Sequence, residues 1–451
     1  MKKDLNQREN WTSRMGFILA AAGSAVGLGN IWRFPYIAGT NGGAAFLLVF
    51  LVAVILIGYP LMVTEMTIGR KSHRNPIGAF KSLAPNTPWW LVGALSVFTA
   101  LAILSYYSVI AGWSLSYIFK ALSGFSSEMA FGEIFTQHIT GISIPLFWHA
   151  IFMLITVGVI SAGVVSGIQK AAKILMPILF ILLIILVLRS VTLEGAGEGL
   201  KFYLSPDFGQ ITPQSILDAI GQAFFTLSLG MGAIITYGSY LSDKENIGDN
   251  AAYVAIFDTL IAVMAGFAIF PALFALTNVA PDAGPGLTFI TLPAVFAEMP
   301  LGSLFGFIFF LLLSIAALTS AISLLETGVA WVVDEKNIPR KKAAIILGII
   351  VFLVGVPPIL GYSAWDGFSF LGFDILDTYD WFANNIFLPL GGLLTSIFAG
   401  YVWKSKKVRD EANKVGGIIN IGKWYGFVVK IVVPIAIILI MIVTIYQKFI
   451  S

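Results

Sequence analysis

Residues 23–30 read GSAVGLGN, and residues 225–232 read FTLSLGMG. Both stretches lie within apolar segments of membrane-spanning length, where each glycine lowers the propensity for helix. Either stretch alone is compatible with an intact helix that presents a small-residue packing face. Because two such stretches stand in corresponding spans, the sequence instead predicts two helices that are each interrupted halfway across a membrane.

The composition places most of the chain in lipid. Of its 451 residues, 58% are hydrophobic and 11% are charged, which leaves too little polar surface to cover a water-soluble globule. Cysteine is absent and only three histidines occur, so we expect no disulfide and no zinc or haem site. The apolar runs predict an all-α polytopic membrane protein with about eleven transmembrane helices, beginning near residues 15, 44, 89, 144, 168, 214, 250, 302, 341, 379 and 424.

The interruptions fall in the first and sixth of these spans. Two five-span halves with corresponding broken helices are the sequence sign of an inverted-repeat transporter. We expect short surface helices in the long connections around residues 122–143, 190–213 and 278–300. The expected segments are 1–14 (cytoplasmic N-terminal segment), 15–190 (first five-helix repeat), 191–213 (extracellular connection), 214–403 (second five-helix repeat), 404–422 (cytoplasmic loop) and 423–451 (eleventh helix, C-terminus outside).

Lysine and arginine gather in alternate connections between the spans. By the positive-inside rule these connections, which include the N-terminus and residues 404–423, are cytoplasmic. No cleavable signal precedes the first span, so we expect that span to stay in the mature protein. The sequence therefore predicts a multi-pass plasma-membrane protein with its N-terminus in the cytoplasm, and the lack of cysteine and of long soluble tails fits a prokaryotic cell.

A broken helix frees backbone groups at membrane depth, and these groups need partners. Carbonyl groups at the end of one half attract Na⁺ or an ammonium group, whereas N–H groups at the start of the next half attract a carboxylate. Two facing breaks therefore form a receptor for a zwitterion, which predicts an amino-acid-like substrate that binds together with cations.

Several ordered motifs between about residues 8 and 400 resemble the neurotransmitter:sodium symporter family. They are Trp11 with RMGF at 14–17, GLGNIWRFP at 27–35, NGGAAF at 41–46, QAFFTLS at 222–228, TLPAVF at 291–296 and AALTS at 316–320. Eleven spans resemble the bacterial branch of this family. The resemblance implies a LeuT-type fold with a 5+5 inverted repeat, and sodium-coupled symport of hydrophobic aliphatic and aromatic L-amino acids by alternating access.

The resemblance also implies a substrate pocket and two sodium sites. The substrate residues are Ser24, Ala25, Gly27, Gly29, Ile103, Tyr107, Phe225, Thr226, Ser228, Met231, Ser323 and Leu324. The first sodium site uses Ala25, Asn30, Thr226 and Asp258 with the substrate carboxylate, and the second uses Gly23, Val26, Ala316, Thr319 and Ser320. Monoamine carriers have Asp at the position of Gly27, so a substrate with its own carboxylate is implied. Without the resemblance, hydroxyl bonds within their own helix are the commoner explanation for Thr319 and Ser320, and ordinary core packing is the commoner one for Met231 and Ile103.

Asp258 departs from the family pattern, which usually has Asn at this position. An ionisable residue within a span is costly and is a functional hypothesis by default. Phe50 and Ala262 stand where chloride-dependent members have Tyr and Ser. We therefore expect Asp258 to supply the negative charge, so that no chloride is required and a proton is a candidate for counter-transport. A plain polar contact between helices is the alternative.

The family pattern further implies gates, a support and a hinge. Arg33 and Asp380 would form the extracellular gate, although Arg33 could instead snorkel to the interface. Arg8, Trp11, Tyr240 and Asp334 would form the cytoplasmic latch, and Glu65 would accept N–H groups from the sixth-span break. Gly167 and Pro177 would let the start of the fifth span unwind and release sodium, although both residue types also serve helix packing.

The sequence leaves several other functions as alternatives. An enzyme is disfavoured because neither an HExxH nor a GxSxG motif is present. Three rivals share this architecture. A channel would show conductance, and a ligand sensor would bind substrate without moving it. A proton-coupled carrier would take up substrate in the absence of sodium. We expect contact with membrane lipid, no nucleic-acid partner and no obligate protein partner.

Overall fold

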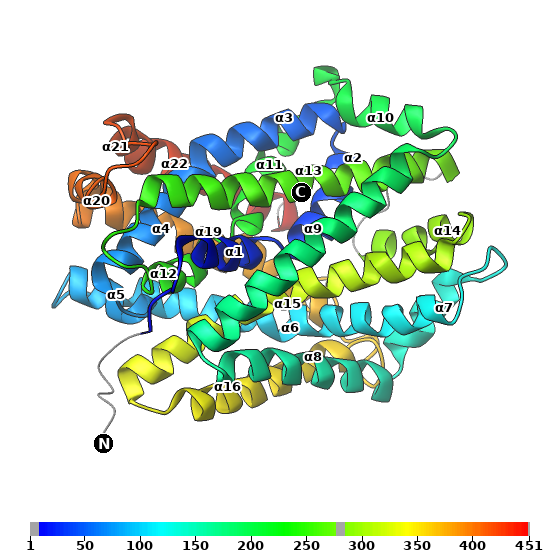
Figure 1. Ribbon diagram of the computed structural model, residues 1–451, viewed down its shortest axis with the longest axis horizontal. Coiled ribbons are helices and arrows are strands. Elements are labelled where there is room, and N and C mark those ends of the chain that lie inside the picture. The colour runs from blue at the N-terminus through cyan, green and yellow to red at the C-terminus, as the bar shows by residue number, and fades with distance from the viewer. Residues whose placement is uncertain (1–8, 277–284, 450–451) are drawn as a thin grey trace.

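The computed structural model describes residues 9–276 and 285–449, and its elements are helices that run mostly along one axis of the molecule (Figure 1). In the described residues, nine helices without a sharp break are long and apolar enough to cross a membrane. They are α3–α4 (Ala44–Ser72), α6 (Trp90–Leu122), α8 (Ser143–Ser161), α9 with its preceding turn (Val164–Val191), α13 (Ile247–Leu276), α15 (Gly302–Lys336), α16–α17 (Arg340–Leu360), α18–α19 (Ile375–Val402) and α21–α22 (Trp424–Phe449).

The first predicted interruption separates α1 (Arg14–Ala25) from the helical segment that contains α2 (Phe34–Thr40). Ser13 caps α1 by accepting a hydrogen bond from the Gly16 N–H, which satisfies one free donor of the first turn. At the other end, Val26 is extended, and the chain then bends by 53° between its two halves. The pair forms a tenth, broken span.

The second predicted interruption divides α11 (Pro213–Thr226) from α12 (Ala233–Gly238). Ser228, Gly230 and Gly232 all have positive φ angles, which a continuous helix cannot accommodate. A side chain at Gly230 would overlap the carbonyl oxygen of Leu388, so glycine is required there for both conformation and space. By length and composition, nine unbroken helices and one bent pair of the described residues can cross a membrane, and the interrupted segment α11–α12 corresponds to the sixth of the eleven predicted spans.

The helices differ in how much of their surface faces the protein. In the most apolar window of α15, 89% of the residues are buried, and in that of α6 the share is 72%. The corresponding share is only 28% for the span that contains α9. Accordingly α15 and α6 form the centre of the bundle, whereas α9 exposes most of its apolar side chains, as a lipid-facing helix does.

Short helices cover the two ends of the bundle. At one end lie α5 (Pro76–Leu83), α20 (Ser405–Ala412) and α21 (Trp424–Phe427), and at the opposite end lie α7 (Phe131–Thr140), α10 (Ala196–Leu204) and α14 (Leu292–Ala297) (Figure 1). The last three confirm the surface helices predicted in the long connections. Residues 277–284 of the third connection lie outside the described residues.

Candidate functional site

A cavity of about 320 Å³ lies where the two broken helices meet α6 and α15. Its lining residues are Ala25, Gly27, Gly29, Ile103, Tyr107, Phe225, Ser228, Met231, Ser320 and Leu324. Nine of these ten were predicted as substrate residues, and Ser320 was predicted as a sodium ligand. Of the three remaining predicted residues, Ser24 and Ser323 share a hydrogen bond between their hydroxyls, 2.7 Å long, and Thr226 belongs to the polar cluster around Asp258 described below.

Gly27 sits at the most crowded point of this cavity. A Cβ atom there would lie 2.8 Å from the Tyr107 hydroxyl and would overlap Oγ of Ser320. The same Tyr107 oxygen accepts a hydrogen bond from the Leu28 N–H, 3.1 Å away. A larger residue at position 27 would therefore displace the polar groups at this end of the cavity.

Hydrogen bonds join the two broken helices directly. The Ser228 hydroxyl in the second break donates to the carbonyl oxygen of Ser24 at 2.9 Å, and Nε2 of Gln222 donates to the carbonyl of Gly29 at 2.8 Å. Ser320 of α15 donates to the same Ser24 carbonyl at 3.0 Å. The Ser24 carbonyl, which the first break frees, is thus partnered by Ser228 in the second break and by Ser320 of α15, as a buried backbone group requires.

Asn30, Thr226 and Asp258 converge in a cluster that is completely buried. Oδ1 of Asp258 accepts from Nδ2 of Asn30 at 2.7 Å, and both carboxylate oxygens lie 3.2 Å from the Thr226 hydroxyl. Oδ1 of Asn30 accepts the Gly27 N–H at 3.0 Å, which connects the cluster to the cavity wall. An arrangement of carboxylate, amide and hydroxyl oxygens offers the hard ligands that alkali cations prefer.

The residues predicted for the second sodium site also come together. Thr319 contacts the carbonyl oxygens of Ala316 at 2.9 Å and Val26 at 3.4 Å, and Ser320 contacts that of Val26 at 3.1 Å. A Cβ atom at Gly23 would lie 3.3 Å from Cβ of Thr319, which places Gly23 in the same cluster. The hydroxyl of Thr319 bonds both within its own helix, to Ile315 and Ala316, and across to the Val26 carbonyl at the first break.

Glu65 lies in α4 (Tyr59–Ser72) and is fully buried. Its Oε1 accepts the Gly230 N–H at 2.7 Å, at the position where the second helix is interrupted. This donor has no helical partner, because the break removes the carbonyl that would normally accept from it. Glu65 therefore has the contact expected of a support for the break.

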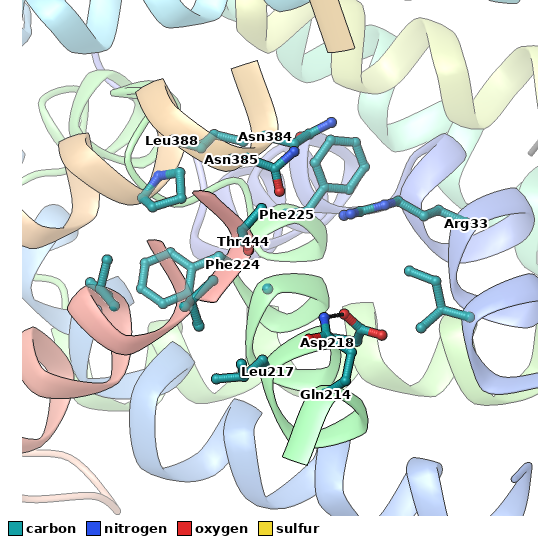
Figure 2. Close-up of a pocket in the computed structure, with 15 residues that line it drawn as sticks. Arg33, Gln214, Leu217, Asp218, Phe224, Phe225, Asn384, Asn385, Leu388 and Thr444 are labelled. Atoms are coloured by element: carbon teal, nitrogen blue, oxygen red, sulfur yellow. Dashed lines mark hydrogen bonds between the residues drawn. The ribbon is translucent and has the colours of Figure 1, made fainter. Parts of the chain in front are cut away.

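A second cavity of about 600 Å³ lies beyond Phe225, on the side of the bundle where α18–α19 begin (Figure 2). Phe225 lines both cavities, and the guanidinium of Arg33 lies 4.9 Å from the centre of its ring. Figure 2 shows the Arg33 side chain reaching toward this ring, with Asp218 hydrogen-bonded to Gln214 on the opposite wall. Phe225 and Arg33 thus separate the outer cavity from the inner one.

The predicted partner of Arg33 has different neighbours. Asp380 accepts a hydrogen bond from Nδ2 of Asn384 at 2.7 Å, and among the residues that the structure describes its carboxylate forms no direct ion pair with Arg33. Asp218, which sequence reasoning did not select, faces this cavity.

At the other end of the bundle, Trp11 closes the space beneath α12. Its indole Nε1 donates to the Tyr237 carbonyl at 3.0 Å, and its ring packs against Phe17, Tyr237 and Tyr240. Asp334 accepts from the Asn75 backbone and side chain at 2.9 and 3.1 Å. Arg8, the fourth residue of the predicted latch, lies outside the described residues.

Two further charged residues extend this latch and were missed by sequence reasoning. Glu326 is fully buried in α15, pairs with Arg340 at the start of α16, and accepts the Tyr240 hydroxyl at 2.5 Å. Nε of Arg340 also donates to the Ile160 carbonyl at 3.0 Å, at the end of α8. The network therefore connects α8, α15 and α16 to the residues that contact Trp11.

The predicted hinge is helical in this structure. Gly167 belongs to a π-helical turn, Val164–Gln169, and Pro177 lies inside α9 (Lys170–Val191). The Glu9 carboxylate accepts the Val164 N–H at 2.6 Å, and Gln169 exchanges hydrogen bonds with Thr12. The N-terminal segment is therefore attached to the start of the segment that was predicted to unwind.

The sequence and the fold both resemble those of known proteins. Residues 8–140 and 136–450 match the sodium:neurotransmitter symporter family. The chain belongs to the sodium:neurotransmitter symporter family. Its fold is similar to the crystal structure of MhsT in complex with L-phenylalanine, with a TM-score of 0.89 and 46% identity, covering 97% of this chain and 99% of MhsT.

Relatives of this symporter occur in bacteria and animals. It is 43% identical to the sodium-dependent transporter YhdH of Bacillus subtilis, over 95% of this chain and 96% of that protein. It is 27% identical to the sodium- and chloride-dependent GABA transporter 2 of Rattus norvegicus, over 91% of this chain and 76% of that protein. The all-α LeuT-type fold with two broken helices, predicted from the sequence, is confirmed, and the protein is a multi-pass sodium-dependent transporter.

Proposed function

We propose that this protein carries hydrophobic L-amino acids, both aliphatic and aromatic, into the cell by sodium-coupled, chloride-independent symport. The observation that carries the proposal is the cavity at the two breaks, which is lined by backbone groups and the Tyr107 hydroxyl together with the apolar side chains of Ile103, Phe225 and Met231. A zwitterion with an apolar side chain matches such a lining. Met231 is flexible, which suits side chains of different shape. The similarity to an L-phenylalanine complex of MhsT supports the same substrate class.

Two sodium ions would travel with the substrate. The cluster of Asn30, Thr226 and Asp258, with the Ala25 carbonyl, supplies oxygen ligands for the first ion, and the substrate carboxylate would complete that shell. The carbonyls of Gly23, Val26 and Ala316, with the hydroxyls of Thr319 and Ser320, supply ligands for the second. Because one ligand of the first ion comes from the amino acid itself, binding of the two is coupled.

Asp258 would replace chloride as the negative charge near the first ion. Phe50 and Ala262 are both fully buried, and neither side chain has a hydroxyl group that could donate a hydrogen bond to chloride. An intramembrane carboxylate needs a cation or a proton when it is buried among helices. A proton that returns on Asp258 after sodium release would make the carrier a sodium symporter with proton antiport.

Alternating access would use the two closed ends described above. Trp11, Tyr240, Asp334 and, by prediction, Arg8 would close the cytoplasmic path. Arg33, Asp380 and Phe225 would close the external one. We propose the orientation given by the positive-inside rule, with the N-terminus in the cytoplasm and the C-terminus outside, and the segment boundaries given under "Sequence analysis". The attachment of Glu9 to Val164 suggests that release of the N-terminal segment would free the start of α9 to unwind between Gly167 and Pro177.

The experiment is uptake of labelled leucine and tryptophan by vesicles that contain the purified protein. An inward sodium gradient is compared with potassium, and chloride with gluconate. We expect accumulation that needs sodium and is unchanged in gluconate. Equal uptake in potassium would reject the sodium sites in favour of proton coupling. If D258N took up substrate at the unaltered rate and still without chloride, the role assigned to Asp258 would fail.

A further inference from the structure

The connection between α19 and α21 carries an unusual share of the positive charge. Residues 404–423 contain six basic residues and two acidic residues, a net charge of +4, whereas the whole chain has a net charge of +3. The basic residues are Lys404, Lys406, Lys407, Arg409, Lys414 and Lys423. The rest of the chain is therefore slightly acidic, and the excess charge is concentrated in one short segment.

Four of these side chains have no acidic partner among the residues that the structure describes. Lys404, Lys406, Lys407 and Lys423 are exposed, and within residues 9–276 and 285–449 none of them forms an ion pair. The two acidic residues of the segment are already engaged: Asp410 by Arg409, and Glu411 by Arg70 and Lys71. The charge of the four lysines is thus directed outward.

Large apolar side chains stand beside these lysines. Ile418 is 83% exposed, the highest value for any large hydrophobic residue in the described part of the chain. Trp424 and Phe427, which follow Lys423, are also exposed. Lysine combined with exposed tryptophan and aliphatic side chains is typical of protein surfaces at the membrane–water interface. There the rings and aliphatic groups enter the lipid, and the ammonium groups stay at the headgroups.

The segment is held in a fixed position, so its exposed face is not the result of a loose loop. Asp249 at the start of α13 accepts the N–H groups of Ile418 and Ile419 at 3.2 and 2.8 Å. Nδ2 of Asn246 donates to the Val415 carbonyl at 2.6 Å. Arg70, which is completely buried at the end of α4, bonds the backbone and the carboxylate of Glu411.

We propose that Lys404, Lys406, Lys407 and Lys423, with Ile418 and Trp424, form a binding surface for anionic phospholipid of the cytoplasmic leaflet. The surface lies at the end of the bundle, beyond α4, where α20 and α21 are adjacent (Figure 1). Charge complementarity identifies the anionic headgroup, and the exposed apolar groups beside it distinguish a lipid from a soluble acidic partner. The assignment to the cytoplasmic leaflet rests on the orientation proposed above.

Because the surface is attached to α4 and to the start of α13, lipid bound there would stabilise the contacts at this end of the bundle. Arg70 connects the segment to α4, which packs against α12, half of the second broken span, and Asp249 connects it to the start of α13. Anionic lipid would therefore favour the arrangement in which this end is closed.

The test uses the full-length protein in nanodiscs of phosphatidylcholine with increasing fractions of phosphatidylglycerol. The chain contains no cysteine, so I418C labelled with an environment-sensitive fluorophore reports lipid at this surface alone. We expect K404Q/K406Q/K407Q/K423Q, combined with I418C, to need at least tenfold more phosphatidylglycerol for the same signal. The signal of I418C alone should also weaken with salt.

The control removes the same charge from lysines at the same end of the bundle. K81Q/K336Q/K341Q/K342Q changes four exposed lysines and should leave the response of I418C unchanged. Two outcomes would overturn the proposal. One is an equal effect in both quadruple variants. The other is a response to a soluble acidic peptide in pure phosphatidylcholine discs but none to phosphatidylglycerol. The measurement needs no sodium gradient and no transport, so its failure is independent of the proposed symport.

Discussion

Oε1 of Glu65 lies 2.7 Å from the backbone nitrogen of Gly230, so a carboxylate on one helix partners the N–H group that is freed by the interruption of another. The positive φ of Gly230 and the contact of its backbone with α19 leave no helical acceptor for that N–H group. The break is therefore maintained by a side chain from outside the broken helix.

Replacement of Glu65 tests this support. We expect E65A to lower the free energy of unfolding by about 1–3 kcal/mol, the cost of a buried donor without a partner, and to weaken sodium-dependent substrate binding. E65Q retains an acceptor oxygen and should lose less. Thermal unfolding in detergent measures the first effect. The control is T67V, because the Thr67 hydroxyl bonds only its own helix at Val63; equal unfolding temperatures for E65A and T67V would contradict the assigned role.

Crowding at Gly27 predicts that even one added methyl group harms substrate binding. In G27A the new Cβ displaces the Tyr107 hydroxyl and Ser320, so we expect binding of labelled leucine to weaken at least tenfold, a cost of about 1.4 kcal/mol or more. Gly158 has no atom within 4 Å of its potential Cβ, and G158A is therefore the matched control. Leucine binding by G27A at the level of G158A would show that the cavity adapts.

Removal of the Trp11 ring should open the path beneath α12. T236C introduces a single thiol at a position that is fully buried, in a chain without other cysteines. We expect the W11A/T236C variant to react with a hydrophilic maleimide about tenfold faster than T236C, because the open population rises. W90A/T236C serves as control, since Trp90 is 43% exposed at the start of α6. Equal rates in all three proteins would mean that Trp11 does not close this path.

The pairing of Glu326 with Arg340 predicts a strong non-additive effect. R340Q leaves the buried Glu326 carboxylate without its cation, at a cost of about 3–5 kcal/mol, and should lower the unfolding temperature sharply. E326Q/R340Q removes both charges and should recover part of this loss. The measurement is a double-mutant cycle of thermal unfolding. Strictly additive effects would indicate that the two residues act independently.

His138 on α7 makes stability depend on pH. Burial, assisted by the charge of Lys120, lowers the pKa of His138 to about 4 from the 6.5 that is usual for histidine. The folded protein thus binds this proton more weakly than the unfolded chain, so the contribution is fully present above pH 6.5 and is lost as the pH falls toward 4. We expect H138N to lose less stability than the parent protein between pH 7 and pH 4.5. Parallel losses in thermal unfolding would contradict this assignment.

The sequence predicts the two breaks well because glycine and an intramembrane carboxylate leave local signals. Asp258 is conspicuous in an apolar run, whereas Asn30 and Thr226 were assigned to the same site only by the resemblance to the symporter family. Both belong to the cluster that the structure brings together.

Of the missed residues, Glu326 carried such a signal, and the others needed three-dimensional information. Glu326 is also an acid within an apolar run, and the rule that selected Asp258 could have found it. Its partner Arg340 stands beyond a turn among other basic residues, and only the packing of α16 on α15 distinguishes it from its neighbours. Asp218 lies near the start of a span, where acids are common. The stacking of Arg33 on Phe225 depends on side-chain directions that the sequence does not specify.

The burial of Asp258 at the centre of the molecule also has an electrical consequence. A zwitterion carries no net charge, so under the proposed mechanism inward movement of two sodium ions with ionised Asp258 would transfer two charges per cycle, and a proton that returned on the carboxylate would reduce this to one. Each charge that crosses a potential of 100 mV is worth about 2.3 kcal/mol, or roughly fiftyfold in the accumulation ratio. This one carboxylate would thus determine how steeply the cell's amino-acid pool follows its membrane voltage.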